Sequence, residues 1–167
     1  MSLHEMRRLF DYNYWANQKL FAALSPLTAE QFTQTVAGSY GSVRNTLVHV
    51  LSAEWGWLDR CGGPPRGAKL EAHDFPTLAS LTELWSRVEV QMREYLGRLS
   101  DEDLAGEVEF TLGGRTQRMT RGDLLQHAAI HAAHHRGQIA LLIRTLGFEP
   151  GNFDFVIFGA TSPAVAR

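Results

Sequence analysis

Cysteine is scarce in this sequence, with Cys61 the single example among 167 residues. One cysteine cannot form a disulfide within the chain, which excludes the disulfide-stapled folds of small secreted domains and favours a reducing compartment. We therefore interpret Cys61 as a small, half-buried apolar side chain. A chain of this length buries roughly 70% of its unfolded surface, so it needs no covalent staple.

Long apolar runs are also absent from the sequence. No segment approaches the roughly 18 to 20 consecutive apolar residues that a membrane span requires. The first residues lead directly into an amphipathic pattern, without the apolar core and small-residue cleavage site of an export signal. We expect a soluble, cytoplasmic protein with no membrane partner.

Neither sign of charge dominates, since 16 basic and 18 acidic residues give a formal net charge of −2. The basic residues are scattered, whereas a nucleic-acid-binding domain usually gathers lysine and arginine on one face. We therefore expect no nucleic-acid partner. The hydrophobic fraction of 44% is ordinary for a soluble globule. With no internal repeat and no linker in view, we predict a single domain over residues 1–167.

Helical periodicity is the main pattern that the sequence does contain. Four long segments carry apolar residues at helical spacing, and each has start or stop signals at its ends. The segments run from Leu3 to Leu24, from Ser42 to the Gly62–Pro65 break, from Thr77 or Ser80 to Leu99, and from Thr120 to Leu146. Thr28–Gln31 has the form of a capping box, so a short helix or turn is expected there. The pattern predicts an all-α four-helix bundle.

Two shorter features interrupt or follow the helical pattern. Residues 107–112 and 115–120 alternate around Gly113–Gly114, which predicts a small β-hairpin between the third and fourth long helices. The apolar tail Phe153–Phe158 is expected to lie as a strap against the bundle. The four tryptophans are expected to pack in the core; they are Trp15, Trp55, Trp57 and Trp85.

Histidine is concentrated in the last long helix. Four of the seven histidines lie there, at positions His127, His131, His134 and His135. At about 100° per residue they share one face with apolar residues, so we expect them to point toward the bundle interior. Buried neutral imidazoles need several hydrogen-bond partners or a metal ion. The pattern therefore favours a metal site.

The spacing of these histidines allows two ligand pairs. Residues four apart on a helix have neighbouring side chains, so His131 and His135 can bind one ion. His127 and His131 have the same spacing, and geometry alone does not choose between the two pairs. His49 is the histidine expected in the middle of another helix, which makes it the natural third ligand.

Three imidazoles without a thiolate suit one divalent transition metal such as zinc, nickel, iron or copper. They leave coordination positions open for water, substrate or a thiol, whereas a structural zinc site usually has four protein ligands. No recognisable nucleophile motif, phosphate-binding glycine loop or carboxylate pair occurs. Any chemistry should therefore run through the metal. The remaining histidines, His4 and His73, are expected to be exposed.

Three segments of the sequence resemble the DinB family, and the resemblance covers nearly the whole chain. The segments are residues 12–17, residues 41–49 together with Glu54 and Trp57, and residues 131–138 with the sequence HAAHHRGQ. The last segment is the most specific. The resemblance implies a four-helix bundle, commonly a homodimer, related to metal-dependent thiol transferases.

The resemblance also implies a ligand set and a function. It assigns the metal, with zinc, nickel or iron as the first candidates, to His49, His131 and His135, and it places His127 and His134 beside the ligands. It implies a stress-response activity that transfers a low-molecular-weight thiol, such as bacillithiol or mycothiol, to a small electrophile. No catalytic side chain is assigned.

Two other functions stay open at this point. One is a structural or interaction module that the metal braces, and the other is a metal-dependent hydrolase. Arg136 falls roughly 140° around the helix from His131, so we predict that it forms a salt bridge between helices or subunits.

Overall fold

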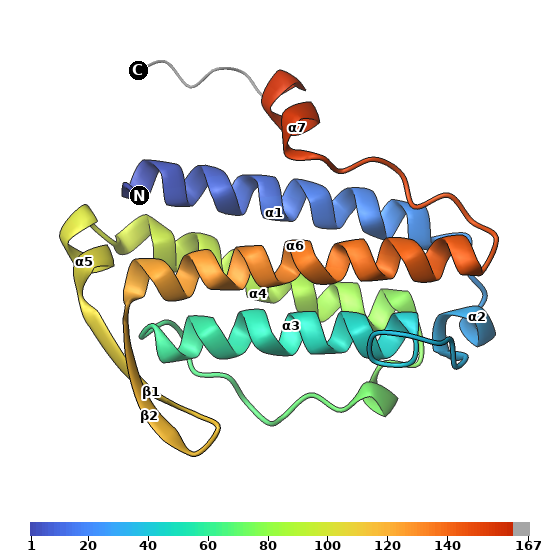
Figure 1. Ribbon diagram of the computed structural model, residues 1–167, viewed down its shortest axis with the longest axis horizontal. Coiled ribbons are helices and arrows are strands. Elements are labelled where there is room, and N and C mark those ends of the chain that lie inside the picture. The colour runs from blue at the N-terminus through green and yellow to red at the C-terminus, as the bar shows by residue number, and fades with distance from the viewer. Residues whose placement is uncertain (162–167) are drawn as a thin grey trace.

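Four long helices form a bundle in the computed structural model, which describes residues 1–161 (Figure 1). They are α1 (Leu3–Leu24), α3 (Val43–Arg60), α4 (Leu78–Arg98) and α6 (Arg121–Thr145). Both α4 and α6 pack against α1 and α3. This arrangement confirms the predicted all-α bundle. No helix within residues 1–161 is long and apolar enough to cross a membrane.

Short polar side chains start the long helices, because each accepts a hydrogen bond from a backbone N–H that the first turn leaves unpaired. These residues are Ser2 before α1, Ser42 before α3, Thr77 before α4 and Thr120 before α6. The predicted alternative start of α4 at Ser80 is therefore wrong, since Ser80 donates its backbone N–H to the Thr77 hydroxyl.

Shorter helical elements connect the long ones. The capping box predicted at Thr28 and Gln31 starts α2 (Ala29–Thr33), and η1 (Ala72–Asp74) precedes α4. One short helix, α5 (Asp101–Ala105), was not predicted from the sequence. A capping box of Ser100 and Asp103 starts it, so the signal was present in a segment too short to show helical periodicity.

The predicted hairpin forms with the expected bounds. Strands β1 (Glu107–Leu112) and β2 (Arg115–Thr120) pair antiparallel, with Leu112 opposite Arg115 at the turn. Gly113 and Gly114 both have positive φ, +57° and +76°, as a two-residue turn of this hand requires. The ring of Phe110 packs edge-on against Trp57, with centroids 5.4 Å apart, which holds the hairpin against α3.

The apolar tail lies along α1 as expected, although part of it is helical. The Tyr12 hydroxyl donates a hydrogen bond to the Phe153 carbonyl at 3.1 Å. Within α7 (Phe155–Thr161), the buried ring of Phe158 packs against the rings of Tyr12 and Trp15. These contacts attach the tail to the outer face of α1 (Figure 1).

The direction of the helices brings a long connection alongside the bundle. In Figure 1, α3 and α4 both run from right to left, whereas α1 and α6 run from left to right. The chain must therefore return along the bundle between α3 and α4, and residues 61–77 make this return (Figure 1). One consequence is that Arg66 lies against the middle of α3, where its guanidinium donates to the Ser52 carbonyl at 3.2 Å.

A layer of buried polar residues crosses the bundle within its apolar core. It consists of Asn13, Asn17, Glu54 and Arg136. Arg136 donates to the side-chain oxygen of Asn13 at 2.5 Å and to that of Asn17 at 2.9 Å. The Asn13 amide nitrogen in turn donates to Glu54 at 3.4 Å. The layer therefore connects α6, α1 and α3 at one level of the bundle.

Arg136 does not form the predicted salt bridge. None of the ion pairs among the described residues includes it, and its hydrogen bonds go to the two asparagine amides. It is 1% exposed, and Glu54 is the buried carboxylate of the same layer. Burial lowers the pKa of Arg136 and raises the pKa of Glu54, while the Tyr14 hydroxyl donates to Glu54 at 2.7 Å. Asn13 thus lies between Arg136 and Glu54 and contacts both, whereas Nε and Nη2 of Arg136 have no hydrogen-bond partner among the described residues.

Cys61 is more deeply buried than predicted, at 1% exposed. It ends α3, and its carbonyl accepts hydrogen bonds from Tyr95 and Arg121, which draws it into the core. Burial raises the pKa of the Cys61 thiol to about 11. Among the tryptophans, Trp85 is buried as expected, whereas the other three are only half-buried.

The polar layer generates a prediction about stability. Arg136→Met removes the positive charge and both asparagine hydrogen bonds, leaving the Glu54 carboxylate buried without a cation. We expect the free energy of unfolding to fall by about 3–5 kcal/mol, which urea unfolding followed by circular dichroism measures.

Arg144→Ala, at an exposed position of the same helix, is the matched control and should change stability by less than about 0.5 kcal/mol. Adding Glu54→Gln to Arg136→Met should recover at least about 1 kcal/mol, because the remaining charge is removed. An Arg136→Met protein as stable as the parent would contradict this account of the layer.

Candidate metal centre

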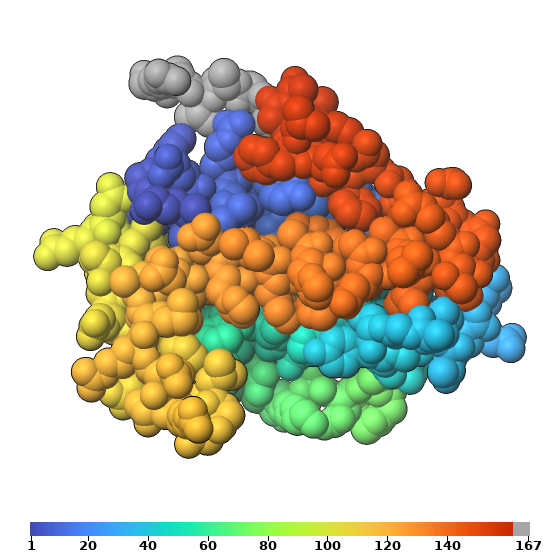
Figure 2. All heavy atoms as spheres, viewed as in Figure 1, coloured from blue at the N-terminus to red at the C-terminus, as the bar shows by residue number. Residues whose placement is uncertain are grey.

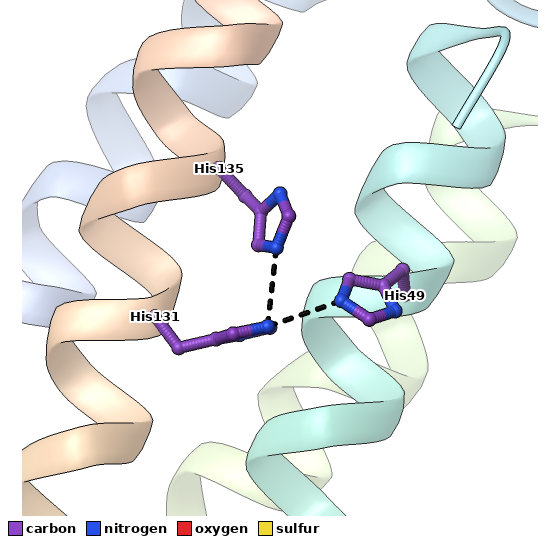
Figure 3. Close-up of side chains that lie close together, drawn as sticks. All are labelled: His49, His131 and His135. Carbon is purple, nitrogen blue, oxygen red and sulfur yellow. Dashed lines mark hydrogen bonds between the residues drawn. The ribbon is translucent and has the colours of Figure 1, made fainter. Parts of the chain in front are cut away.

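Three histidine rings from two helices converge at the interface of α3 and α6 (Figure 3). His49 lies on α3, and His131 and His135 lie one turn apart on α6. The Nε2 atom of His131 is 3.0 Å from Nε2 of His49 and 3.1 Å from Nε2 of His135. One ligand atom from each of the three rings lies within 4.8 Å of the other two. The structure thus brings together the three residues singled out as ligands.

These distances are compatible with a shared metal ion as well as with hydrogen bonds between the rings. Zinc–nitrogen bonds of about 2.0–2.1 Å place neighbouring ligand atoms of a tetrahedral ion roughly 3.3 Å apart. Two sides of the histidine triangle are close to that length. In a neutral imidazole, Nε2 either carries the proton and donates or is bare and accepts. Three Nε2 atoms that face one another therefore cannot all pair through hydrogen bonds. The donor set is therefore suited to a shared cation.

Gln138 fixes the orientation and tautomer of His135. The amide oxygen of Gln138 lies 2.7 Å from His135 Nδ1 and also accepts from the Ser39 hydroxyl at 2.7 Å. Since this oxygen is an acceptor only, the ring proton of His135 is on Nδ1. The Nε2 lone pair is then free to face His131, as a metal ligand requires.

Tyr40 covers the His49 side of the cluster. Its ring stacks on the His49 ring, with centroids 4.0 Å apart, and its hydroxyl lies 2.9 Å from His49 Nε2. The neighbouring Ser39 has a φ of +49°, in the left-handed region that few non-glycine residues adopt. Hydrogen bonds from Thr46 and to Gln138 hold Ser39 in place, which positions Tyr40 over the cluster.

The surroundings of the cluster favour neutral imidazoles. Burial, followed by the proximity of His135 and His49, lowers the pKa of His131 to about 4. Burial also lowers the pKa of His49 and of His135, although the hydrogen bond to Gln138 opposes the shift at His135. A neutral ring has a nitrogen lone pair that can bind a metal cation, whereas a doubly protonated ring has none.

The other histidines lie outside the cluster. His127 and His134 are exposed, so the expectation that all four α6 histidines point into the bundle was wrong. At about 100° per residue, His127 and His134 fall at the same edge of the arc, and that edge faces solvent, whereas His135 at the opposite edge is buried. His127 packs edge-on against Trp57, and His134 Nε2 lies 3.0 Å from the Gln138 amide nitrogen. The prediction that His4 and His73 are exposed is confirmed.

The cluster lies at the edge of the bundle, next to a cavity of about 300 Å³. The centre of the bundle holds the polar layer, and His49 and His131 are only half-buried. In Figure 2 the surface is hollowed between the hairpin and residues 61–77. The cavity lining includes His49, His131 and Trp57, together with Thr111 and Leu112 of β1. A small molecule in this cavity would touch the imidazoles directly.

Sequence reasoning missed two residues of this site. Tyr40 was interpreted only as part of a chain break between Gly38 and Gly41, because nothing in a four-residue loop predicts where its side chain points. Gln138 shares the histidine face and lies in the segment that resembles the family. Its spacing of three residues from His135 was the available signal for the hydrogen bond.

Comparisons with known proteins agree with this fold. A model of the DinB family matches residues 1–163. Protein DinB of Bacillus subtilis (strain 168) is 23% identical over 158 residues, covering 90% of this chain and 91% of that protein. The uncharacterized protein YizA of the same organism is 26% identical over 153 residues, covering 90% of this chain and 94% of that protein.

Solved structures show the same fold. A DinB-like protein from Bacillus cereus ATCC 10987 superposes with a TM-score of 0.74 at 21% identity, covering 90% of this chain and 97% of that one. A conserved protein from Enterococcus faecalis gives a TM-score of 0.59 at 15% identity, covering 83% and 94%. Since the family model spans almost the entire sequence, the chain belongs to the DinB family.

Proposed function

We propose that this protein binds one divalent transition metal through His49, His131 and His135 and acts as a metal-dependent transferase of a low-molecular-weight thiol. The observation that carries the proposal is the convergence of three Nε2 atoms from two helices beside an open cavity. Membership of the DinB family supports it, because the family resembles metal-dependent thiol transferases.

A bound divalent ion lowers the pKa of a coordinated thiol, normally about 8.5, so that the thiol reacts as a thiolate at neutral pH. The residues of the chain supply the rest. His49, His131 and His135 hold the ion with neutral rings, and Gln138 keeps His135 oriented. In the reaction a sulfur–carbon bond forms to the electrophile, the bond to the leaving group breaks, and the thiol proton passes to the leaving group or to solvent.

Two observations favour this function over a structural metal site. Structural zinc sites are normally closed by four protein ligands. Among residues 1–161, the cluster of ligand-type side chains contains three members, and a cavity adjoins it.

A metal-dependent hydrolase would use the same three histidines, but it usually needs a carboxylate as general base. No aspartate or glutamate lines the described cavity. The buried carboxylate Glu54 faces Tyr14 and Asn13 in the polar layer instead. The transferase therefore fits this site better. The homodimer, the cytoplasmic location and the stress role stay predictions.

Each ligand should be needed for metal binding. His49→Ala, His131→Ala and His135→Ala each remove one of three donors, and we expect each to weaken zinc affinity at least about 100-fold. Competition with a chromogenic chelator, on protein purified without nickel affinity resin, measures the affinity.

Two variants serve as controls for this experiment. His73→Ala, at an exposed position, should leave zinc affinity unchanged. His127→Ala tests the competing ligand pair and should change affinity by less than about tenfold, because His127 is exposed and packs against Trp57. A His127→Ala protein that loses zinc while His135→Ala retains it would assign the site to the other pair.

Removing the metal should abolish thiol transfer. The metal-loaded protein should accelerate conjugation of a small thiol with a chlorinated aromatic electrophile, and chelator-treated protein or His131→Ala should return the rate to that of the uncatalysed reaction. Chromatography of the conjugate measures the rate, with zinc re-addition as the control for irreversible damage. Equal rates with and without metal would overturn the proposed transferase.

A further inference from the structure

Two arginine side chains lie against the wall of the cavity beside the histidine cluster. Arg60 is the last residue of α3, and its guanidinium folds back to donate to the Gly56 carbonyl at 3.0 Å. Arg66 comes from the returning segment and donates to the Ser52 carbonyl at 3.2 Å and to the Ser52 hydroxyl at 3.1 Å. Both arginines line the same cavity as His49 and His131. Two positively charged side chains from different segments thus line the same cavity.

Gly56 allows the two guanidinium groups to approach each other over α3. A Cβ atom at Gly56 would lie 3.0 Å from Nη1 of Arg60 and 3.3 Å from Nη1 of Arg66. The two nitrogens can therefore be no more than about 6 Å apart, since each lies close to the same point. Two like charges at this distance repel each other, and an anion bound between them would relieve that repulsion.

Neither arginine has an acidic partner among residues 1–161. The described lining of the cavity contains no aspartate or glutamate. Arg60 is held instead by stacking on Trp57, with its guanidinium carbon 5.0 Å from the ring centroid. In the described part of the chain, each guanidinium uses only Nη1 in hydrogen bonds to protein. The remaining N–H groups of both forks are available to oxygen atoms of a ligand.

The arginines lie at a defined distance from the histidine cluster. Ser52 and Gly56, where the two guanidinium groups are anchored, follow His49 by three and seven residues on the same helix. At 1.5 Å per residue, these anchors are about 5 and 10 Å along the axis from His49. A small molecule of several bonds' length can therefore reach both the histidines and the arginines within one cavity.

We propose that Arg60 and Arg66 form an anion-binding site that selects, as the substrate of this protein, a thiol carrying a carboxylate several bonds from its sulfur. Arginine forks bind carboxylates through paired, charge-assisted hydrogen bonds, and Trp57 and Gly56 place the two forks for that purpose. The selection of a thiol rests on the proposed function, whereas the anion site does not. Both arginines are specificity-determining residues, distinct from the metal ligands.

A matched pair of thiols tests the selection. The cobalt-loaded protein is titrated with 6-mercaptohexanoate and with 6-mercaptohexanol, and the sulfur-to-cobalt absorption band reports coordination. We expect the carboxylate thiol to bind at least about tenfold more tightly than the alcohol. Arg60→Gln and Arg66→Gln should each bring the two affinities to within about threefold, mainly by weakening the carboxylate thiol. Arg87→Gln, an exposed arginine of α4, should retain the parent's preference.

A second measurement separates failure of this inference from failure of the proposed function. Acetate and inorganic phosphate are titrated separately into the protein while the arginine Nε–H resonances are followed by NMR. We expect acetate to shift the Arg60 and Arg66 signals in the parent and to leave the remaining arginine signal unmoved in Arg66→Gln. Larger shifts with phosphate than with acetate would overturn the carboxylate assignment.

The outcomes are distinct. If both thiols coordinate cobalt with equal affinity in the parent, the selection by Arg60 and Arg66 is overturned and the proposed function stands. If neither thiol coordinates while acetate still shifts the two arginine signals, the anion site stands and the thiol function is overturned. An absence of anion-dependent shifts in the parent would overturn the anion site itself.

Discussion

The buried contact of Arg136 with Asn13 and Asn17 is the constraint on which the rest of the structure depends. An arginine that is 1% exposed has no water to satisfy it, so α6 must present it where α1 offers two amide oxygens. Asn13 also donates to Glu54 of α3. These hydrogen bonds form together only when α1, α3 and α6 have the right rotation about their axes and the right position along them. An apolar core alone tolerates small sliding of its helices, whereas this layer does not.

The position of the histidine cluster follows from that fixed register. His135 is adjacent to Arg136 in sequence, and His131 lies one turn away on the same helix. Glu54 and His49 lie on α3, so the contact between Asn13 and Glu54 also sets the level of His49 relative to α6. The three Nε2 atoms meet because the polar layer aligns their helices, and the rings themselves sit at the edge of the bundle where a cavity reaches them.

Local signals in the sequence were sufficient for most of the fold and for naming the candidate ligands. Capping side chains, helical spacing and the Gly113–Gly114 turn each act over a few residues, so the long helices and the hairpin were predictable. His49 was predicted as the third ligand from its position in the middle of another helix. The choice of His135 over His127 needed the family resemblance, because both lie four residues from His131. The position of Tyr40, the burial of Arg136 and the meeting of Arg60 with Arg66 depend on tertiary contacts between distant segments, which no local pattern specifies.

The central claim is that imidazoles of α3 and α6 share one ion. X-ray absorption at the zinc edge of the zinc-loaded protein tests it most directly, because it reports the ligands of the ion itself. The account predicts about three imidazole nitrogens at roughly 2.0–2.1 Å, with the remaining positions filled by light atoms from solvent. A spectrum with sulfur in the first coordination sphere of freshly loaded, thiol-free protein, or with one imidazole or none, would contradict it.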